Sequence, residues 1–137
     1  MLLDDMGDLL STGGLGTVGS TIFLGYEPPA PDAVVVVYET AGLAPERAMS
    51  PLAGTVVCER PGVQIVCRGV RDDYATPRQQ AHLAWKLIEG LQPRTLNGRR
   101  YLYAEAIQSP FPMRRDDVGR VLIGFNAVAW KELATSS

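Results

Sequence analysis

Apolar residues recur at helical spacing in two segments of the chain, one at its start and one beyond its middle. The segment Leu2–Leu10 places them on one face of a helix, with acidic residues in the first turns, where carboxylates suit the helix dipole. The segment Ala81–Leu91 has apolar residues at i, i+3, i+4, i+7 and i+10. We therefore predict two helices, with Trp85 as a buried anchor of the second and Thr76 as its N-cap before Pro77.

Apolar and β-branched runs bounded by turn residues predict the strands of a sheet. These strands are expected at Thr21–Tyr26, Ala33–Thr40, Val63–Val70, Tyr101–Gln108 and Val121–Trp130. The second of them is apolar at nearly every position, as in a central strand that is covered on both sides. Asn97-Gly98 is the preferred dipeptide of a two-residue hairpin turn, and the last two strands are expected to pair with each other.

Glycine and proline residues predict a loop and a turn in the middle of the chain. We interpret Ala41–Gly54 as a loop that is long enough for a functional or interface role. Pro61-Gly62 is interpreted as the turn of a hairpin, which makes Cys58 and Cys67 diagonal neighbours beyond the usual disulfide distance. Both cysteines are therefore expected to be reduced, with Cys67 in the core.

The most informative segment joins the last two predicted strands. Pro110 and Pro112 bracket Phe111, and two arginines and two aspartates follow. The prolines are expected to prevent ladder pairing and to hold Phe111 extended, where a compact domain has little to bury it against. We therefore predict a hairpin arm that contacts another subunit. The candidate interface residues are Pro110, Phe111, Pro112, Met113, Arg114, Arg115, Asp116 and Asp117.

The length of 137 residues is enough for one hydrophobic core but short for two. We predict a single α+β domain over residues 1–137, with a mixed, largely antiparallel β-sheet and two helices packed on one face. Residues 134–137 are expected to form a disordered tail. The longest apolar runs are too short to cross a bilayer, and the start of the chain lacks the features of a secretory signal. We therefore expect the protein to stay in the cytoplasm where it is made.

The charge of the chain argues against a protein that holds nucleic acid. Lys and Arg total 13 and Asp and Glu total 15, which gives a net charge of −2. Proteins that bind DNA through its phosphates normally have a basic surplus, whereas a mildly acidic surface allows DNA to pass close by. The Arg99-Arg100 and Arg114-Arg115 pairs are therefore expected to form salt bridges between subunits.

The sequence contains no residue constellation for catalysis, cofactor binding or metal binding. His82 is the only histidine, and no nucleophile motif accompanies it. One histidine and two cysteines do not supply four convergent metal ligands. Three pairs of adjacent acids adjoin expected helix or loop ends, where both carboxylates would stay in solvent. These pairs are Asp4/Asp5, Asp72/Asp73 and Asp116/Asp117.

The order and spacing of several segments resemble a known family of proteins. The segments are the first helix followed by Gly16–Phe23, the strand Val34–Glu39, PGVQIVCRG at Pro61–Gly69, the helix Ala81–Leu91 and LNGRRYLYAEAIQSPFPMRRDDVGR at Leu96–Arg120 with a closing strand. In this order they resemble the tail-terminator and minor capsid proteins of long-tailed, siphovirus-type bacteriophages. The resemblance covers nearly the whole chain, and its most specific piece is Asn97–Arg115.

The resemblance implies a structural protein of the virion. A tail terminator forms a six-membered ring that caps the finished tail tube, stops its elongation and joins it to the head connector. The implied partners are other copies of the chain, the tube protein and a connector or stopper protein, with DNA passing only through the lumen and no membrane. A head-completion or neck connector protein is an alternative of the same class. A small ligand-binding α+β domain or enzyme, with a pocket between the second helix and the sheet, is an alternative of a different class.

Overall fold

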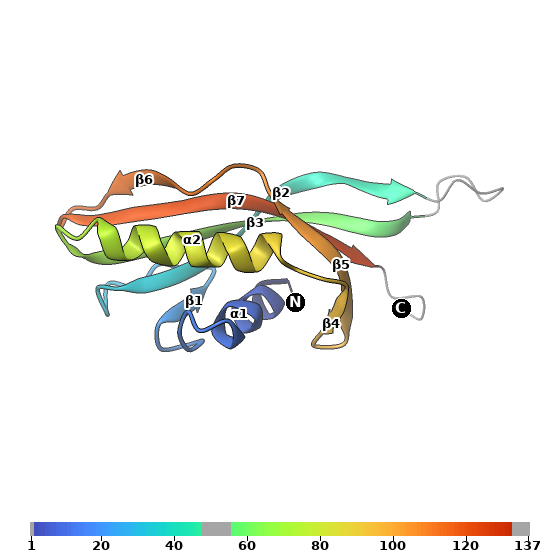
Figure 1. Ribbon diagram of the computed structural model, residues 1–137, viewed down its shortest axis with the longest axis horizontal. Coiled ribbons are helices and arrows are strands. Elements are labelled where there is room, and N and C mark those ends of the chain that lie inside the picture. Colours follow the sequence, from blue (N-terminus) through green and yellow to red (C-terminus); the bar gives the residue numbers. More distant parts are fainter. Residues whose placement is uncertain (1, 48–55, 133–137) are drawn as a thin grey trace.

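The computed structural model describes residues 2–47 and 56–132, and within them it has two helices and seven strands. The elements are α1 (Leu2–Thr12), β1 (Ile22–Leu24), β2 (Val34–Arg47), β3 (Val56–Arg71), α2 (Ala75–Glu89), β4 (Arg94–Leu96), β5 (Arg99–Ala106), β6 (Phe111–Arg115) and β7 (Arg120–Glu132). Both helices pack on the same side of a curled sheet (Figure 1). The predicted α+β class is therefore confirmed, whereas the predicted tail, 134–137, lies outside the described residues.

The seven described strands form one sheet in which the last strand along the chain is central. The strand order is β1-β2-β3-β7-β5-β4, and β6 pairs with β7 beyond the end of β5. Neighbouring strands are antiparallel except for β1 and β2. In the middle of the sheet Gln64 of β3 lies opposite Asn126 of β7, and its amide donates a hydrogen bond to the Asn126 side chain at 3.1 Å.

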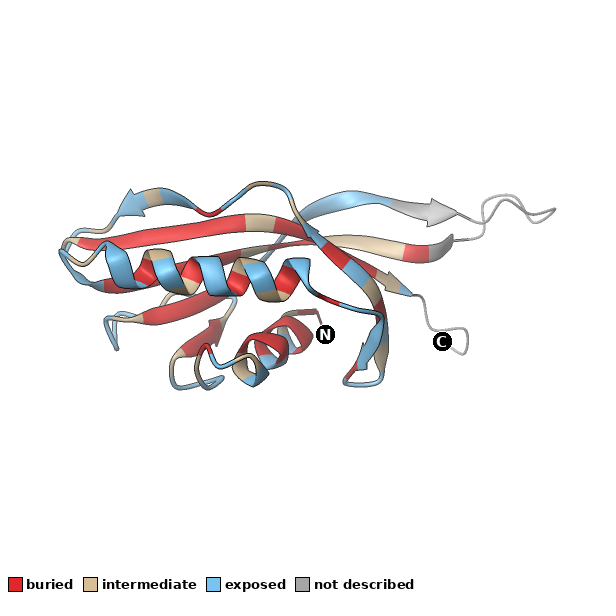
Figure 2. Ribbon diagram, viewed as in Figure 1, coloured by how far each residue is buried: buried red, intermediate tan, exposed pale blue. Residues whose placement is uncertain are grey.

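Alternation along the central strands sends every second side chain to the helix-covered face. Ile65, Ile123 and Phe125 are completely buried there, against Met6 of α1 and Ile88 of α2 in the same core. Figure 2 shows buried residues repeating along the sides of both helices that face the sheet. Since full burial of such a side chain stabilises the fold by roughly 1.5–3 kcal/mol, this core positions every other element.

Two predictions for the middle of the chain are wrong. The segment Ala41–Gly54 is not a loop throughout, because β2 continues to Arg47 beside β3, while residues 48–55 lie outside the described part. Pro61-Gly62 is not a turn, because β3 runs through both residues. Cys58 and Cys67 therefore lie on one strand. Both are buried and not joined by a disulfide, as predicted, and burial raises the pKa of the Cys67 thiol to about 12.

Glycines mark the place where the paired strands β2 and β3 approach each other closely at a bulge. A Cβ on Gly42 would overlap the carbonyl oxygen of Arg60, and a Cβ on Gly62 would lie 2.7 Å from the carbonyl oxygen of Ala41. The register shifts on either side of Leu43, which is how β-bulges bend a strand. Glycine thus permits a close approach of two long paired strands here, where the sequence pattern predicts a turn.

The predicted hairpin at Asn97-Gly98 is confirmed. Both residues have positive φ, 51° and 80°, as a two-residue turn of this kind requires, and Leu96 pairs with Arg99 across it. The predicted pairing of the strand that follows with the last strand is confirmed as well, because β5 pairs with β7 as far as Ala106.

The second helix has the predicted apolar stripe but different details at two positions. It begins at Ala75, so Thr76 lies inside it, and the Asp73 carboxylate accepts a hydrogen bond from the Thr76 backbone N–H at 3.2 Å. Trp85 is only partly buried and stacks on His82, with ring centroids 5.6 Å apart. The stripe is buried through its smaller residues and Ile88 instead. Neither described helix is long and apolar enough to cross a membrane.

Candidate interaction surface

The predicted interface segment, Pro110–Asp117, forms an edge strand and not an unpaired arm. Phe111 pairs with Gly124 and Arg115 pairs with Val121, so β6 extends the sheet beside β7. A register shift after Pro112 accommodates the proline, which is tolerated on an edge strand and at a bulge. The prediction that the prolines prevent pairing is therefore wrong. The chain reverses in the following turn, where Gly119 N–H donates to the Asp116 carbonyl at 3.1 Å.

The two arginines of β6 form ion pairs within the chain. Arg114 Nη2 lies 2.6 Å from Glu27 Oε2, and the other oxygen of the same carboxylate is 3.1 Å from the buried Arg68. Arg115 Nη1 lies 3.1 Å from Asp72 Oδ1. The arginine pair that was expected to bridge subunits therefore has partners in its own chain. Among the described residues, Arg114 donates only through Nη2, to Glu27. Its Nε and Nη1 atoms can therefore donate to a further acceptor.

Asp116 organises the turn after β6. Its carboxylate accepts the backbone N–H of Arg120 at 2.9 Å and the Arg120 Nε at 2.7 Å. Arg120 is buried and also lies 3.0 Å from Asp32. Burial alone would raise the pKa of Asp116, but these hydrogen bonds outweigh it and the pKa lies below its usual value. The expectation that both members of the Asp116/Asp117 pair stay in solvent is therefore wrong for Asp116, whereas Asp117 is exposed.

The accessible side chains of β6 are apolar at the start of the strand and basic at its end. Phe111 is 37% exposed although it is a large aromatic residue, Met113 is partly exposed, and Pro110 is buried. Because Phe111 pairs with Gly124, its side chain lies on the sheet face without helices, and the Arg114–Leu122 pair places Arg114 on that face too. An exposed aromatic residue beside arginine is typical of contacts between proteins.

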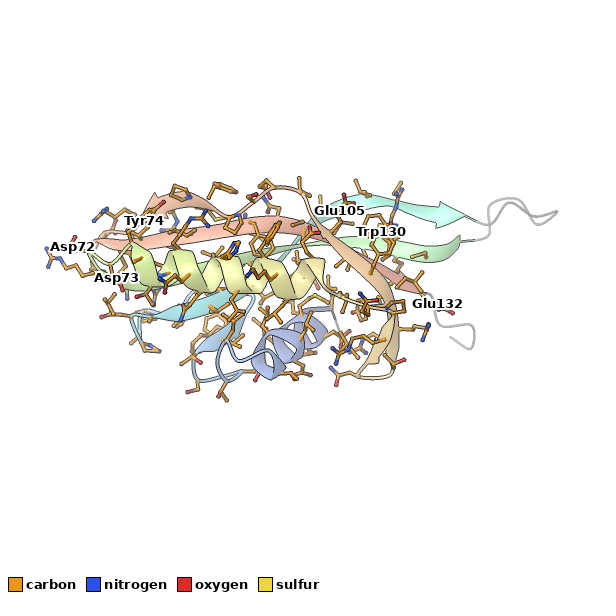
Figure 3. The ribbon with its side chains drawn as sticks, in the orientation of Figure 1. Asp72, Asp73, Tyr74, Glu105, Trp130 and Glu132 are labelled. Atoms are coloured by element: carbon orange, nitrogen blue, oxygen red, sulfur yellow. The ribbon has the colours of Figure 1, made fainter. Side chains whose placement is uncertain are left out.

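A hollow lined mostly by apolar side chains lies farther along the same face. Its volume is about 310 Å³, and its lining residues are Leu43, Glu105, Ala106, Ile107, Val128 and Trp130. Ile107 is 62% exposed and Leu43 is 51% exposed. Tyr103 stacks on Trp130 with ring centroids 4.3 Å apart. Figure 3 shows Glu105 and Trp130 toward the opposite end of the sheet from Asp72, the partner of β6. The sequence did not predict this hollow.

A second cluster that the sequence did not predict surrounds Asp5. Its carboxylate is completely buried and accepts hydrogen bonds from Arg99 Nε at 2.7 Å, from the Tyr101 hydroxyl and from Asn97 Nδ2 at 2.9 Å. Burial by itself raises the pKa of Asp5, but the hydrogen bonds from Arg99, Tyr101 and Asn97 hold it below its usual value. The cluster attaches α1 to the β4–β5 hairpin.

Two predictions about these charged residues are therefore wrong. Asp5 does not stay in solvent, and Arg99 pairs with it inside the chain, as Arg100 does with Glu132 at 3.5 Å. Exposed pairs such as Arg100–Glu132 contribute little to stability, whereas a buried one is costly to break. Both arginines are thus engaged without a second subunit.

The described residues contain no group of three or more His, Cys, Asp or Glu side chains arranged to hold a metal ion. His82 lies on the exposed side of α2, stacked on Trp85. The polar clusters described above are arginine–carboxylate networks that tie strands and loops together.

The chain matches a known protein family. The family model described as bacteriophage tail terminator protein matches residues 9–132, which is most of the chain and includes every strand of the sheet. The match begins within α1, so Asp5 precedes it. A comparison with curated proteins finds no similar sequence.

Proposed function

The chain belongs to the family of bacteriophage tail terminator proteins, and from this membership we propose that its copies close into a hexameric ring on the end of the tail tube. The protein is accordingly a structural component of the virion tail and not an enzyme. In the proposed role the ring stops further addition of tube subunits and offers a surface to the head connector. DNA passes through the lumen without being held, in keeping with the net charge of −2.

The observation that supports a ring is the presentation of β6. Ladder pairing with β7 holds this edge strand in place while Phe111 stays 37% exposed. A rigid strand loses little conformational freedom on binding, so more of its contact energy remains for association. The residues of the proposed contact are those predicted from the sequence, Pro110–Asp117. Ring closure needs no cofactor, because a contact between two different surfaces repeats around an axis.

The ring can be tested by measuring the mass of the purified protein. Sedimentation and light scattering should give six times the 14.8 kDa chain mass, and negative-stain images should show rings. Addition to polymerising tube protein should give short tubes that carry a particle at one end. A protein that remains a monomer both in solution and on tubes would contradict the proposal, and binding to a connector but not to tubes would favour a neck protein.

A further inference from the structure

We propose that the hollow beside Trp130 receives β6 of a neighbouring copy, with Phe111 of that copy against its apolar wall and Arg114 against Glu105. The inference rests on the proposed ring and names the surface that accepts the edge strand. The hollow holds about 310 Å³, and two of its lining residues, Leu43 and Ile107, are more than half exposed.

The chemistry of the two surfaces is complementary. Apolar side chains and one carboxylate, that of Glu105, line the hollow. Among the described residues Glu105 has no ion-pair partner, and it is exposed. The edge strand offers an exposed aromatic ring, and three residues farther on it offers a guanidinium with two unused nitrogen atoms. An apolar contact beside a charge pair is thus available from the chain itself.

The contact cannot form within one chain. Phe111 is opposite Gly124 of β7, whereas Glu105 is opposite Val128 of the same strand. Four residues of a strand separate these positions by about 13 Å, and both neighbours of β7 are fixed to it by ladder pairing. The side chain of Phe111 therefore does not reach its own hollow, so the occupant is a second copy.

The same placement makes the contact heterologous, since the edge strand and the hollow are different surfaces at different places on one face. Each copy can then give β6 to one neighbour and accept β6 from the other. Repetition of such a contact closes a ring when the rotation that relates neighbouring copies is a whole fraction of a full turn. This is the kind of interface that the proposed terminator ring needs.

A charge exchange tests the pairing of Glu105 with Arg114. We expect Glu105→Arg alone and Arg114→Glu alone each to raise the dissociation constant of the assembly at least tenfold, because each places like charges in contact. The double variant should recover to within about threefold of the original chain. Sedimentation velocity measures assembly, and circular dichroism shows that each variant is folded. Lys86→Glu, on the exposed side of α2, is the matched control and should assemble normally.

The possible outcomes test the proposed contact separately from the proposed ring. Rings that are unaffected by the single changes, or not recovered by the double variant, would refute the contact and leave the proposed function standing. A protein that never assembles refutes both.

A cross-link gives an independent measurement in case Arg114→Glu destabilises β6 through Glu27. Chains with Ile107→Cys mixed with chains with Phe111→Cys should form a covalent pair on mild oxidation, and neither chain should do so alone. The native cysteines are buried and do not compete. Absence of the mixed pair under conditions where rings form would overturn the contact.

Discussion

At the scale of single residues, the buried Asp5 links the first helix to a distant hairpin. A completely buried carboxylate is unfavourable unless hydrogen bonds and an opposite charge compensate it. Arg99, Tyr101 and Asn97 provide both, and all three come from the β4–β5 hairpin and its turn. The first helix is therefore attached to a hairpin more than 90 residues later, by polar contacts as well as by its leucines.

Replacing Asp5 with Asn should lower the free energy of unfolding by about 3 kcal/mol, because it leaves Arg99 without its buried partner. Urea unfolding at neutral pH measures this change. Asp8→Asn is the control: Asp8 is exposed and only accepts a hydrogen bond from Asn97 at 2.8 Å. Its effect should stay below about 1 kcal/mol. Equal effects of the two changes would show that the cluster does not stabilise the fold.

The lowered pKa values of Asp5 and Asp116 predict how stability depends on pH. A carboxyl whose pKa is lower in the folded chain adds stability above the pKa of the unfolded chain, about 4, and this stability is lost as the pH falls through the folded value. The free energy of unfolding should therefore be nearly constant from pH 7 to about pH 5 and fall below that. Asp5→Asn should fall less steeply over the same range. Parallel curves for the two proteins would exclude Asp5 as a source of the acid sensitivity.

The burial of Asp5 could not be predicted from the sequence. The leucine pattern correctly predicts which face of α1 is buried, but Asp5 also reaches that side, and its partner Arg99 is 94 residues away. Periodicity describes one element at a time. A buried ion pair between two distant elements needs the register of the sheet, which the sequence pattern does not contain.

At the scale of elements, α2 shows which part of a predicted stripe is essential. Ile88 is completely buried, whereas Trp85 is only packed against the edge of the core. We expect Ile88→Ala to lower the free energy of unfolding by about 3 kcal/mol. Trp85→Ala should cost less than half as much, despite the larger side chain. Denaturant unfolding of both variants checks this, and a larger effect for Trp85 would mean that its ring is buried after all.

The strand β6 should matter for assembly and not for folding. Phe111→Asp should leave the circular dichroism spectrum and the melting temperature almost unchanged. It should raise the dissociation constant of the ring at least tenfold, because it places a charge in an apolar contact. Leu83→Asp is the control, because it makes the same kind of change on α2 at a similarly exposed residue. The exposed fraction is 40% for Leu83 and 37% for Phe111. Normal assembly of the Phe111 variant would remove β6 from the interface.

The elements themselves differ in how well sequence predicts them. Helix periodicity and the Asn97-Gly98 turn have short-range causes, so both helices and the β4–β5 hairpin are predicted correctly. The β2–β3 pair is not, because Gly42 and Gly62 allow two paired strands to approach closely at a bulge, and glycine in a sequence equally indicates a turn. The edge-strand role of β6 was hidden for a similar reason, since proline both ends strands and occupies their edges.

At the scale of the whole molecule, the charge of the chain fits the proposed role, in which DNA passes without being held. The chain has a net charge of −2, and Arg68, Arg114, Arg115 and Arg120 all pair with carboxylates. Few phosphates can therefore be neutralised on binding. The sequence predicted the fold class and singled out Pro110–Asp117, although as an unpaired arm. The hollow is formed by Leu43, Ile107 and Trp130, among others, which only the sheet brings together.

We expect no measurable binding of duplex DNA at physiological salt, and little more when the salt is lowered. Fluorescence anisotropy with a labelled duplex measures this. Arg114 and Arg115 changed together to Glu should weaken association between copies and leave this weak DNA signal unchanged. Micromolar binding that decreases steeply as salt rises would contradict the passive lumen and favour a protein that grips the genome.

The central position of β7 affects the order in which the molecule can be made. Residues near the middle of the sheet, such as Gln64 and Asn126, are 62 positions apart, and contacts of long sequence separation form slowly. On the ribosome β3 and β5 emerge first, and each has an edge without its final partner until β7 follows. The hollow, which β5 and β7 build together, does not exist in the unfinished chain. A nascent copy therefore offers no receiving surface for the proposed contact until β7 has paired with β5.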